Sequence, residues 1–155
     1  MLPDTGKDDS FAEFFSDVEH KLRGAFTAAF GPDVGREVCS EALAYGWENW
    51  DRLKGMENPS GYLYRVGVGL GRRAKPSFRM VYEPMAVDAP GWFEPGLAEA
   101  LASLSEKQRV VVSLVHGYGW SLSEVADLLG VGKSTVQSYE QRGMKRLRRK
   151  LGVVQ

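Results

Sequence analysis

The chain of 155 residues is long enough for one ordinary domain or two very small ones. Its apolar residues (43%) and charged residues (26%) are balanced as in a soluble globular protein, which excludes a disordered or fibrous chain. No apolar run approaches the roughly 18 residues that cross a bilayer, and the N-terminus MLPDTGKDDS is polar and acidic. We therefore expect a cytoplasmic protein without membrane insertion.

The net charge is zero, but the charges are sorted along the chain. Residues 1–60 carry twelve acids and six bases, whereas residues 61–80 carry five bases and no acid. Residues 81–104 hold four acids and no base, and residues 105–155 hold nine bases against four acids, with six of the nine in RGMKRLRRK. A solvated helix face is one explanation, but two separate basic runs favour contacts with a nucleic acid.

Three amphipathic helices are predicted in the first half of the chain. Residues 11–30 place phenylalanines at three- and four-residue steps, and Gly31-Pro32 ends this helix. The other two predicted helices are 34–53 and 60–75, joined by the polar loop Arg52–Ser60.

Cys39 falls in the second helix and is interpreted as a small buried apolar group, not a reactive thiol. With only His20 and His116 beside it, no metal-ligand cluster is recognisable, and we expect no metal and no cofactor.

The glycines at 67, 69 and 71 resemble a dinucleotide-binding fingerprint. That motif needs its third glycine at position 72, where Arg72 stands, and a preceding strand that this helical stretch lacks. We reject the dinucleotide site, and a close contact between helices is the alternative explanation.

Residues 81–96 contain three prolines and two glycines without periodicity, which predicts a flexible linker. After it, Ser105 with Gln108 and Ser121 with Glu124 have the spacing of capping boxes, so each pair predicts a helix start. Gly130 suits a helix end, and a last helix is predicted from about Lys133 to Lys150.

The string Gly-Lys-Ser-Thr at 132–135 ends like an ATP-binding phosphate loop. Such a loop needs a glycine at position 127, where Asp127 stands, and a strand where this chain has an amphipathic helix. The sequence favours a helix-turn-helix instead, with an ATP-using enzyme as the less favoured alternative. The expected DNA contacts are Lys133, Ser134, Thr135, Gln137 and Ser138 at the start of the last helix, and Arg142, Lys145, Arg146 and Arg149 further along.

Several segments together resemble the extracytoplasmic-function group of bacterial sigma-70 family sigma factors. LSEKQRVVVSLVHGYGWSLSEVADLLGVGKSTVQSYEQRGMKRLRRKLG resembles the family's C-terminal promoter-reading domain. FAEFFSDVEHKLRGAF, REVCSEALAYGWENWDRL and NPSGYLYRVGVGLGRR resemble successive helices of its N-terminal domain. The resemblance implies an all-α fold of two small helical domains: a region 2-like domain at 10–80, the linker at 81–96, and a region 4-like helix-turn-helix domain at 97–152.

The resemblance also implies a function and partners. The protein would bind core RNA polymerase and promoter DNA, recognise the minus-ten and minus-thirty-five elements, and perform no catalysis itself. The family commonly has an anti-sigma protein as a further partner. The residues implied to bind the polymerase are Glu37, Ser40, Glu41, Leu43 and Trp47, and those implied to hold the separated DNA strand are Asn58, Ser60, Tyr62, Arg65, Arg72 and Arg73.

Two features bear on these assignments. Tyr62 and Tyr64 lie beside the cation Arg65 in the sequence, and bases of single-stranded DNA stack on aromatic rings beside cations. Tyrosines at helical spacing are, however, more often core residues. Glu140 stands where the family's recognition helix commonly has an apolar residue. A sigma-like or response-regulator-like DNA-binding regulator that does not bind polymerase productively is the alternative function.

Overall fold

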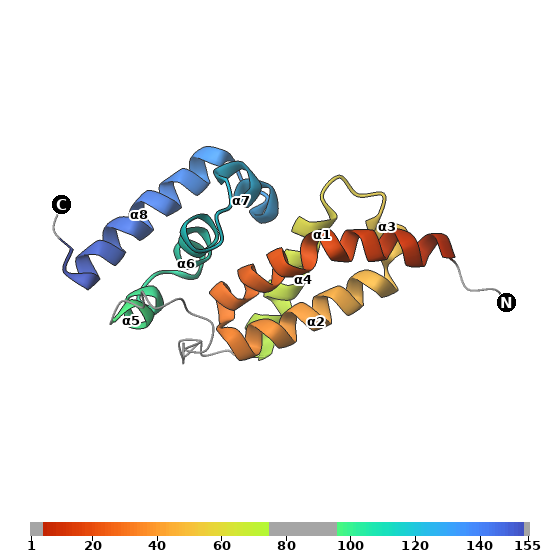
Figure 1. Ribbon diagram of the computed structural model, residues 1–155, viewed down its shortest axis with the longest axis horizontal. Coiled ribbons are helices and arrows are strands. Elements are labelled where there is room, and N and C mark those ends of the chain that lie inside the picture. Colours follow the sequence, from red (N-terminus) through yellow and green to blue (C-terminus); the bar gives the residue numbers. More distant parts are fainter. Residues whose placement is uncertain (1–4, 75–95, 154–155) are drawn as a thin grey trace.

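The computed structural model describes residues 5–74 and 96–153, and every regular element in these ranges is helical. The N-terminal half holds α1 (Thr5–Phe30), α2 (Pro32–Glu48), the short α3 (Trp50–Leu53) and α4 (Pro59–Ala74). The C-terminal half holds α5 (Leu97–Ala102), α6 (Glu106–Val112), the π-helical turn η1 (Ser113–Gly117), α7 (Leu122–Leu129) and α8 (Lys133–Leu151). Figure 1 shows the two halves packed side by side, with the start of α1 and the end of α8 far apart. The predicted all-α fold is confirmed.

The helix boundaries follow the sequence signals, except that α1 begins at Thr5, ahead of the predicted start at Phe11, and that one predicted helix is interrupted. The predicted helix 34–53 is divided at Asn49, whose side-chain nitrogen donates a hydrogen bond to the backbone oxygen of Tyr45 at 2.9 Å. The backbone nitrogen of Asn49 donates to the same oxygen at 3.0 Å, so the Tyr45 carbonyl accepts two hydrogen bonds where α2 ends. The predicted linker 81–96 lies outside the described residues except for Gly96, as do Lys75 and Arg79 of the first basic run.

The glycines of α4 let this helix lie directly against α1. A Cβ atom built on Gly67 would lie 2.2 Å from the ring of Phe26, and one on Gly71 would lie 2.5 Å from the ring of Phe30. Both distances are far below van der Waals contact, so only glycine fits at these two positions. Close helix contact therefore explains Gly67 and Gly71, whereas a Cβ on Gly69 would meet nothing within 4 Å.

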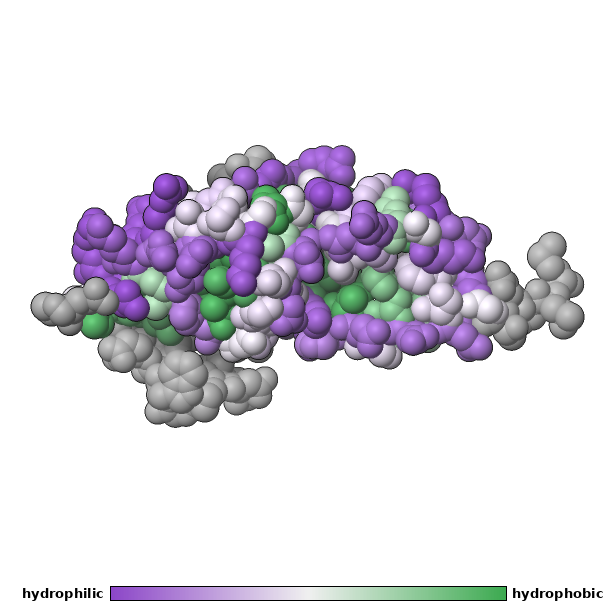
Figure 2. Space-filling view, turned by 90° about the horizontal axis from the view of Figure 1, so that it is seen from above, coloured by the Kyte–Doolittle hydropathy of each residue, from purple (hydrophilic) through white to green (hydrophobic). Residues whose placement is uncertain are grey.

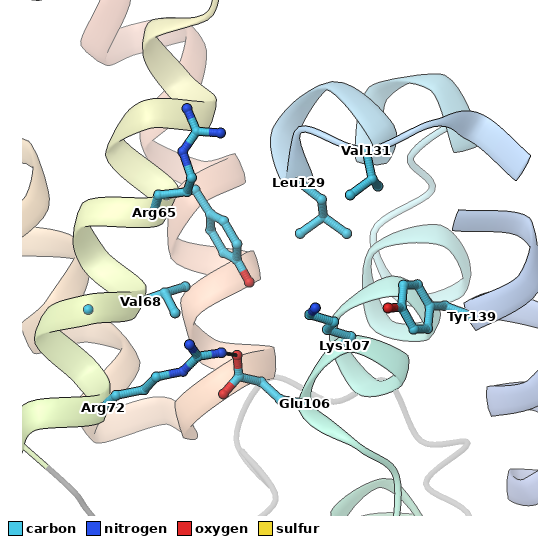
Figure 3. Close-up of a pocket in the computed structure, with 10 residues that line it drawn as sticks. Arg65, Val68, Arg72, Glu106, Lys107, Leu129, Val131 and Tyr139 are labelled. Carbon is cyan, nitrogen blue, oxygen red and sulfur yellow. Dashed lines mark hydrogen bonds and ion pairs between the residues drawn. The ribbon is translucent and has the colours of Figure 1, made fainter. Parts of the chain in front are cut away.

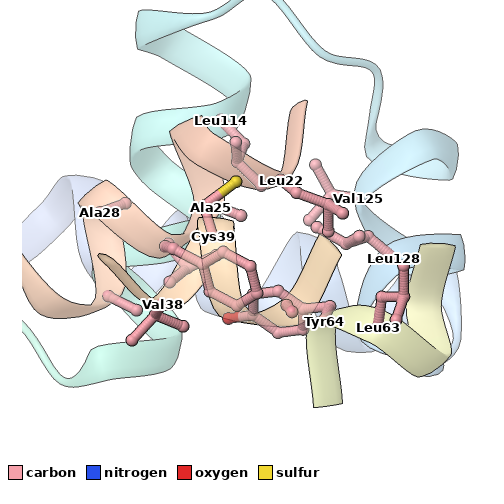
Figure 4. Close-up of a cluster of buried hydrophobic side chains, with 14 of the residues drawn as sticks. Leu22, Ala25, Ala28, Val38, Cys39, Leu63, Tyr64, Leu114, Val125 and Leu128 are labelled. Atoms are coloured by element: carbon pink, nitrogen blue, oxygen red, sulfur yellow. The ribbon is translucent and has the colours of Figure 1, made fainter. Parts of the chain in front are cut away.

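One hydrophobic core runs through both halves of the molecule. It includes Leu22 and Leu63 from the N-terminal half and Leu114, Val125 and Leu128 from the C-terminal half, each at most 4% exposed. Figure 4 shows these side chains converging where α1 and α4 meet the C-terminal half. Because burial of apolar surface is the main stabilising term in folding, the two halves stabilise each other across this contact.

The outer surface is predominantly polar. Figure 2 shows hydrophilic residues over much of one face, with hydrophobic ones gathered in a few patches between them. Among the described residues, no helix combines the length and the apolar character that a bilayer-spanning segment needs.

Cys39 lies in the core and is 4% exposed, as the sequence predicts. Burial, reinforced by the nearby Glu19 carboxylate, raises the pKa of its thiol from 9.0 to about 11. The thiolate form is therefore scarce near neutral pH, which makes this cysteine unreactive.

The glycine contacts of α4 predict opposite effects for two neighbouring substitutions. Gly67→Ala forces a methyl group into the Phe26 ring, so we expect the free energy of unfolding to fall by about 1–3 kcal/mol. Gly69→Ala is the matched control, because a Cβ there meets nothing within 4 Å, and the better helix former should add up to about 1 kcal/mol. Urea unfolding followed by circular dichroism measures both, and equal effects would contradict the close approach.

Candidate nucleic-acid interface

Helices α7 and α8 form the predicted helix-turn-helix. Gly130 ends α7 in the left-handed conformation at φ 68°, which glycine adopts without strain. The backbone nitrogen of Val131 then donates to the oxygen of Ala126 at 3.1 Å, and Gly132 stands at the N-cap of α8. The turn between the two helices is therefore only three residues long, from Gly130 to Gly132.

Both predicted capping boxes are present. The Ser121 hydroxyl accepts a hydrogen bond from the backbone nitrogen of Glu124 at 3.1 Å, and the Glu124 carboxylate accepts one from the nitrogen of Ser121 at 3.2 Å. Ser105 and Gln108 make the same reciprocal pair at the start of α6. The bonds at Ser121 hold the pKa of the Glu124 carboxyl below its ordinary value. Each box satisfies backbone donors that the first turn of a helix leaves free.

The outer face of α8 carries the residues expected to meet DNA. Val136, Gly143 and Leu147 face inward and are buried. The exposed residues include every predicted contact: Lys133, Ser134, Thr135, Gln137 and Ser138 in the first turns, then Arg142, Lys145, Arg146 and Arg149. Short polar groups therefore lie at the helix N-terminus, where the macrodipole favours phosphate, and a row of cations follows.

The phosphate-loop alternative does not fit the structure. The residues before Gly130 form α7, whereas a phosphate loop follows a strand. Asp127 occupies the position where the motif requires a glycine. The Gly-Lys-Ser-Thr string is the start of α8.

Glu140 is paired in a way that the sequence did not predict. One oxygen of its carboxylate lies 2.9 Å from Nε2 of His116 in η1. The Glu140 side chain thus joins α8 to η1. This contact explains how an acidic residue is accommodated at a position that is commonly apolar.

Asn58 and Ser60, two of the predicted strand-binding residues, lie at the start of α4. The Asn58 side-chain oxygen accepts hydrogen bonds from the Gly61 nitrogen at 3.0 Å and from the Ser60 hydroxyl at 3.1 Å. Its side-chain nitrogen donates to the backbone oxygen of Asp127 in α7. Asn58 therefore caps α4 and also touches the C-terminal half.

Tyr62 belongs to a polar cluster with Tyr45 and Arg52. The Arg52 guanidinium donates to the Tyr45 hydroxyl at 2.6 Å and to the Tyr62 hydroxyl at 3.3 Å, and it lies 5.5 Å from the centre of the Tyr62 ring. The hydrogen bonds to Tyr45 and to Arg52 lower the pKa of Tyr62. Tyr64, by contrast, is 6% exposed and stacks on Phe26 at 5.4 Å, so it is a core residue and no platform for a base.

The arginines of α4 differ in their surroundings. All three are exposed, and Arg65 and Arg72 also line a pocket on the side of α4 that faces the C-terminal half. Nη2 of Arg72 lies 3.0 Å from a carboxylate oxygen of Glu106 in α6. Figure 3 shows Arg65 and Arg72 on one side of a cavity of about 380 Å³, with Lys107 and Tyr139 of the C-terminal half on the other.

Four of the five predicted polymerase-binding residues lie on the outer face of α2. Glu37, Ser40, Glu41 and Trp47 are exposed. Leu43 is only 6% exposed and lines a groove of about 420 Å³ between α1 and α2, which Phe15 and Trp47 also line. The surface combines carboxylates with two partly exposed aromatic rings, because Phe15 is 41% and Trp47 38% exposed.

Comparison with known proteins identifies the C-terminal part of the chain. Residues 100–149 match the family model described as Sigma-70, region 4. These residues form a sigma-70 region 4 domain. We refer to residues 100–149 below as the region 4 domain.

Two further similarities extend this result. A stretch of 59 residues is 36% identical to RNA polymerase sigma factor FliA from Pseudomonas aeruginosa, and it covers 38% of this chain but only 24% of that protein. The fold is similar to that of the sigma factor RpoE in its complex with the anti-sigma factor NepR from Bartonella quintana. That similarity has a TM-score of 0.66 at 20% identity and covers 94% of this chain and 99% of RpoE.

Arg109 of the region 4 domain is the residue whose importance the sequence analysis missed. It is 3% exposed, and its guanidinium donates to the backbone oxygens of Ala28 at 2.7 Å, Ala29 at 2.9 Å and Leu104 at 3.1 Å. Burial lowers the pKa of Arg109, although an arginine stays charged at physiological pH. A signal was present in the sequence, because the next three residues are all valine and α6 is therefore buried on several sides.

The capping box at Ser121 predicts a measurable loss of stability on mutation. Ser121→Ala removes the acceptor for the first turn of α7, so we expect the free energy of unfolding to fall by about 1 kcal/mol. Ser123→Ala, an exposed position on the same helix, is the control and should change stability little. Thermal unfolding by calorimetry compares the variants, and an unchanged melting temperature for Ser121→Ala would contradict the role of the cap.

Proposed function

We propose that the protein is a sigma factor that binds core RNA polymerase and directs transcription initiation at promoters with minus-ten and minus-thirty-five elements. The observation that carries the proposal is the region 4 domain, a helix-turn-helix whose second helix exposes hydrogen-bonding and cationic side chains. The polymerase performs the chemistry, so no residue of this chain is assigned a catalytic role. A protein with this task works in the cytoplasm.

The proposed division of labour has two domains. Residues 10–80 would act as a region 2-like domain, and residues 97–152 as the promoter-reading domain, with residues 81–96 as the linker. The similarity of fold to RpoE over 94% of the chain supports a two-domain sigma arrangement over a helix-turn-helix attached to a response regulator.

Upstream DNA would be read by α8. In a helix-turn-helix the second helix lies in the major groove with its first residues against base edges. Lys133, Ser134, Thr135, Gln137 and Ser138 occupy that position here and are exposed. Arg142, Lys145, Arg146 and Arg149 lie further along the exposed face, where they would contact phosphates.

The separated strand of the minus-ten element would lie across the start and one face of α4. Single strands bind where aromatic rings and cations occur together, and Tyr62 with Arg52 supplies such a pair. Asn58, Ser60, Arg65, Arg72 and Arg73 complete the proposed surface.

The outer face of α2 would bind the polymerase. Glu37 and Glu41 offer negative charge to a basic partner, and Trp47 with Leu43 and Phe15 offers apolar contact beside it. An anti-sigma protein is a further proposed partner, because RpoE, which has a similar fold, was solved with NepR.

The DNA contacts predict losses of affinity for an upstream-element duplex. Lys133→Ala and Arg142→Ala should each weaken binding, and each lost phosphate contact should reduce the slope of log affinity against log salt by about 0.9. Arg23→Ala is the control, because this exposed arginine lies on α1 and pairs with Glu19. Fluorescence anisotropy across a salt series measures these slopes, and normal binding by both α8 variants would contradict the groove assignment.

Polymerase binding is tested by charge reversal on α2. Glu37→Lys with Glu41→Lys should abolish retention by immobilised core polymerase and remove the product of a run-off transcription assay, because the surface changes sign. Glu99→Lys, an exposed carboxylate of α5, is the control and should retain both activities. DNA binding by the unaltered protein without any retention by polymerase would instead favour a DNA-binding regulator of another kind.

A further inference from the structure

Three polar side chains from three helices of the N-terminal half meet at one place. Tyr45 lies in the last turn of α2, Arg52 in α3 and Tyr62 in the first turn of α4. Nη2 of Arg52 donates to the Tyr45 hydroxyl at 2.6 Å, and Nη1 donates to the Tyr62 hydroxyl at 3.3 Å. The two hydroxyls lie 3.3 Å apart, so the three groups form a hydrogen-bonded triangle.

The helices that carry the triangle are anchored by buried neighbours. In α3, Trp50 is 4% exposed and Leu53 is fully buried. In α4, Leu63 is fully buried directly after Tyr62. Arg52 itself is exposed and Tyr62 is half-buried, so both side chains reach the surface from a fixed backbone. Their mutual hydrogen bonds restrict the rotation that such long side chains otherwise have.

The triangle offers both groups that bind a nucleotide of a single strand. The ring centres of Tyr45 and Tyr62 are 6.4 Å apart, and the Arg52 guanidinium lies 5.5 Å from the centre of the Tyr62 ring. Bases stack on aromatic rings beside such cations with little dependence on sequence. A guanidinium has five N–H donors, and the two hydroxyls use two of them, so further donors can reach a phosphate.

Tyr45 belongs to none of the surfaces assigned under the proposed function. Leu43 and Trp47 of the same helix line the groove between α1 and α2, on the proposed polymerase side. Tyr45 instead bonds to α3 and α4 through Arg52 and Tyr62. The two sides of α2 can therefore serve different partners, and a change at Tyr45 can be separated from a change in polymerase binding.

We propose that Tyr45 and Arg52 position the Tyr62 ring as the stacking platform for one unpaired base of the minus-ten strand, and that Arg52 binds the adjoining phosphate. The inference rests on the proposed sigma function and adds Tyr45 to its strand-binding surface. Tyr45 acts through Tyr62 and is a positioning residue, whereas Arg52 also touches the DNA. Because the triangle holds the ring before the strand arrives, less conformational freedom is lost on binding.

The same hydrogen bonds change the acidity of Tyr62. The bond to Tyr45 and the bond to Arg52 lower the pKa of Tyr62, and the positive charges of Arg52 and Arg65 act in the same direction. Loss of either bond should therefore raise the pKa of Tyr62 toward its ordinary value. This shift reports the position of the Tyr62 hydroxyl without any DNA present.

Conservative variants of the full chain test the positioning. Tyr45→Phe keeps the ring and removes only the hydroxyl. Arg52→Lys keeps the charge but replaces the planar fork by a single nitrogen. Tyr62→Ala removes the platform itself. Tyr118→Phe and Arg23→Lys are the matched controls, because these exposed residues lie outside the proposed strand-binding surface. Circular dichroism verifies that each variant keeps its helix content.

Fluorescence anisotropy measures binding to a fluorescein-labelled single strand of about 20 nucleotides and mixed sequence, since stacking tolerates any base. We expect Tyr62→Ala to lose at least about fivefold in affinity, because a stacked ring is removed. Tyr45→Phe and Arg52→Lys should each lose about two- to tenfold, the contribution of a hydrogen bond. The slope of log affinity against log salt should stay the same in both, because no charge is removed. Both controls should bind as the unaltered protein does.

Two further measurements separate positioning from other effects. Ultraviolet absorbance in an alkaline titration follows tyrosine ionisation, and subtraction of the curve of Tyr62→Phe isolates Tyr62. Tyr45→Phe and Arg52→Lys should raise the pKa of Tyr62, whereas Tyr118→Phe should leave it unchanged. Retention of Tyr45→Phe by immobilised core polymerase should equal that of the unaltered protein, because the groove of Trp47 lies on the other side of α2.

The outcomes distinguish this inference from the proposed function. Unchanged single-strand affinity in folded Tyr45→Phe and Arg52→Lys would overturn the inference, as would a loss of affinity with no change in the pKa of Tyr62. It also fails if the unaltered protein supports promoter-dependent transcription but does not bind the single strand. If the unaltered protein is neither retained by core polymerase nor able to support transcription, the proposed function fails, and the inference fails with it.

Discussion

The positive charge of Arg109 against the C-terminal end of α1 is the interaction on which the arrangement of the two halves depends. A guanidinium loses its hydration when it is buried, and hydrogen bonds to carbonyl oxygens must replace that hydration. Here the acceptors come from Ala28, Ala29 and Leu104, so the donors are satisfied only when α1 and the region 4 domain are in register. Among the described residues, no buried side-chain nitrogen or oxygen lacks a hydrogen-bond partner. The hydrogen bonds of Arg109 therefore specify how the two halves are oriented. The apolar contacts beside them supply most of the stability of the interface.

Helix α1 is the element that serves both halves. Its phenylalanines 26 and 30 occupy the space that the glycines of α4 leave open, and its final carbonyls receive Arg109. A single helix thus positions the proposed strand-binding helix on one side and the region 4 domain on the other. Any partner that displaces the region 4 domain leaves Phe26 and Phe30 in contact with α4, because those contacts lie within the N-terminal half. The N-terminal bundle can therefore keep its internal packing when the contact between the halves opens.

Features set by neighbouring residues were predictable from the sequence. The serines at 105 and 121 marked two helix starts, and Gly130 marked the turn of the helix-turn-helix, because caps and turns depend on residues only a few positions apart. The exposed face of α8 followed from the helical spacing of its polar residues. Tyr62 and Tyr64 show the limit of such patterns, since only the structure distinguishes the ring in a polar cluster from the ring stacked in the core.

Features set by distant residues were not predictable. Arg109 bonds to Ala28, 81 residues away in the sequence, and Asn58 bonds to Asp127, 69 residues away. No local spacing encodes such partners, so the sequence predicted two small domains joined by a linker and gave no sign of the core that the two halves share. The domain limits and the individual DNA and polymerase contacts remain predictions.

Arg109 follows its acceptors Ala28 and Ala29 by 81 and 80 residues in the sequence, so it is synthesised well after them. Ribosomes add residues in sequence order, at roughly 5–20 per second, so α1 and α2 emerge well before α6. During that interval the oxygens of Ala28 and Ala29 remain hydrated, and the apolar side of α1 around Leu22 has no cover from Val110 or Leu114. During synthesis the N-terminal bundle therefore exposes a hydrophobic surface of α1 to solvent, where chaperones or other chains can bind it.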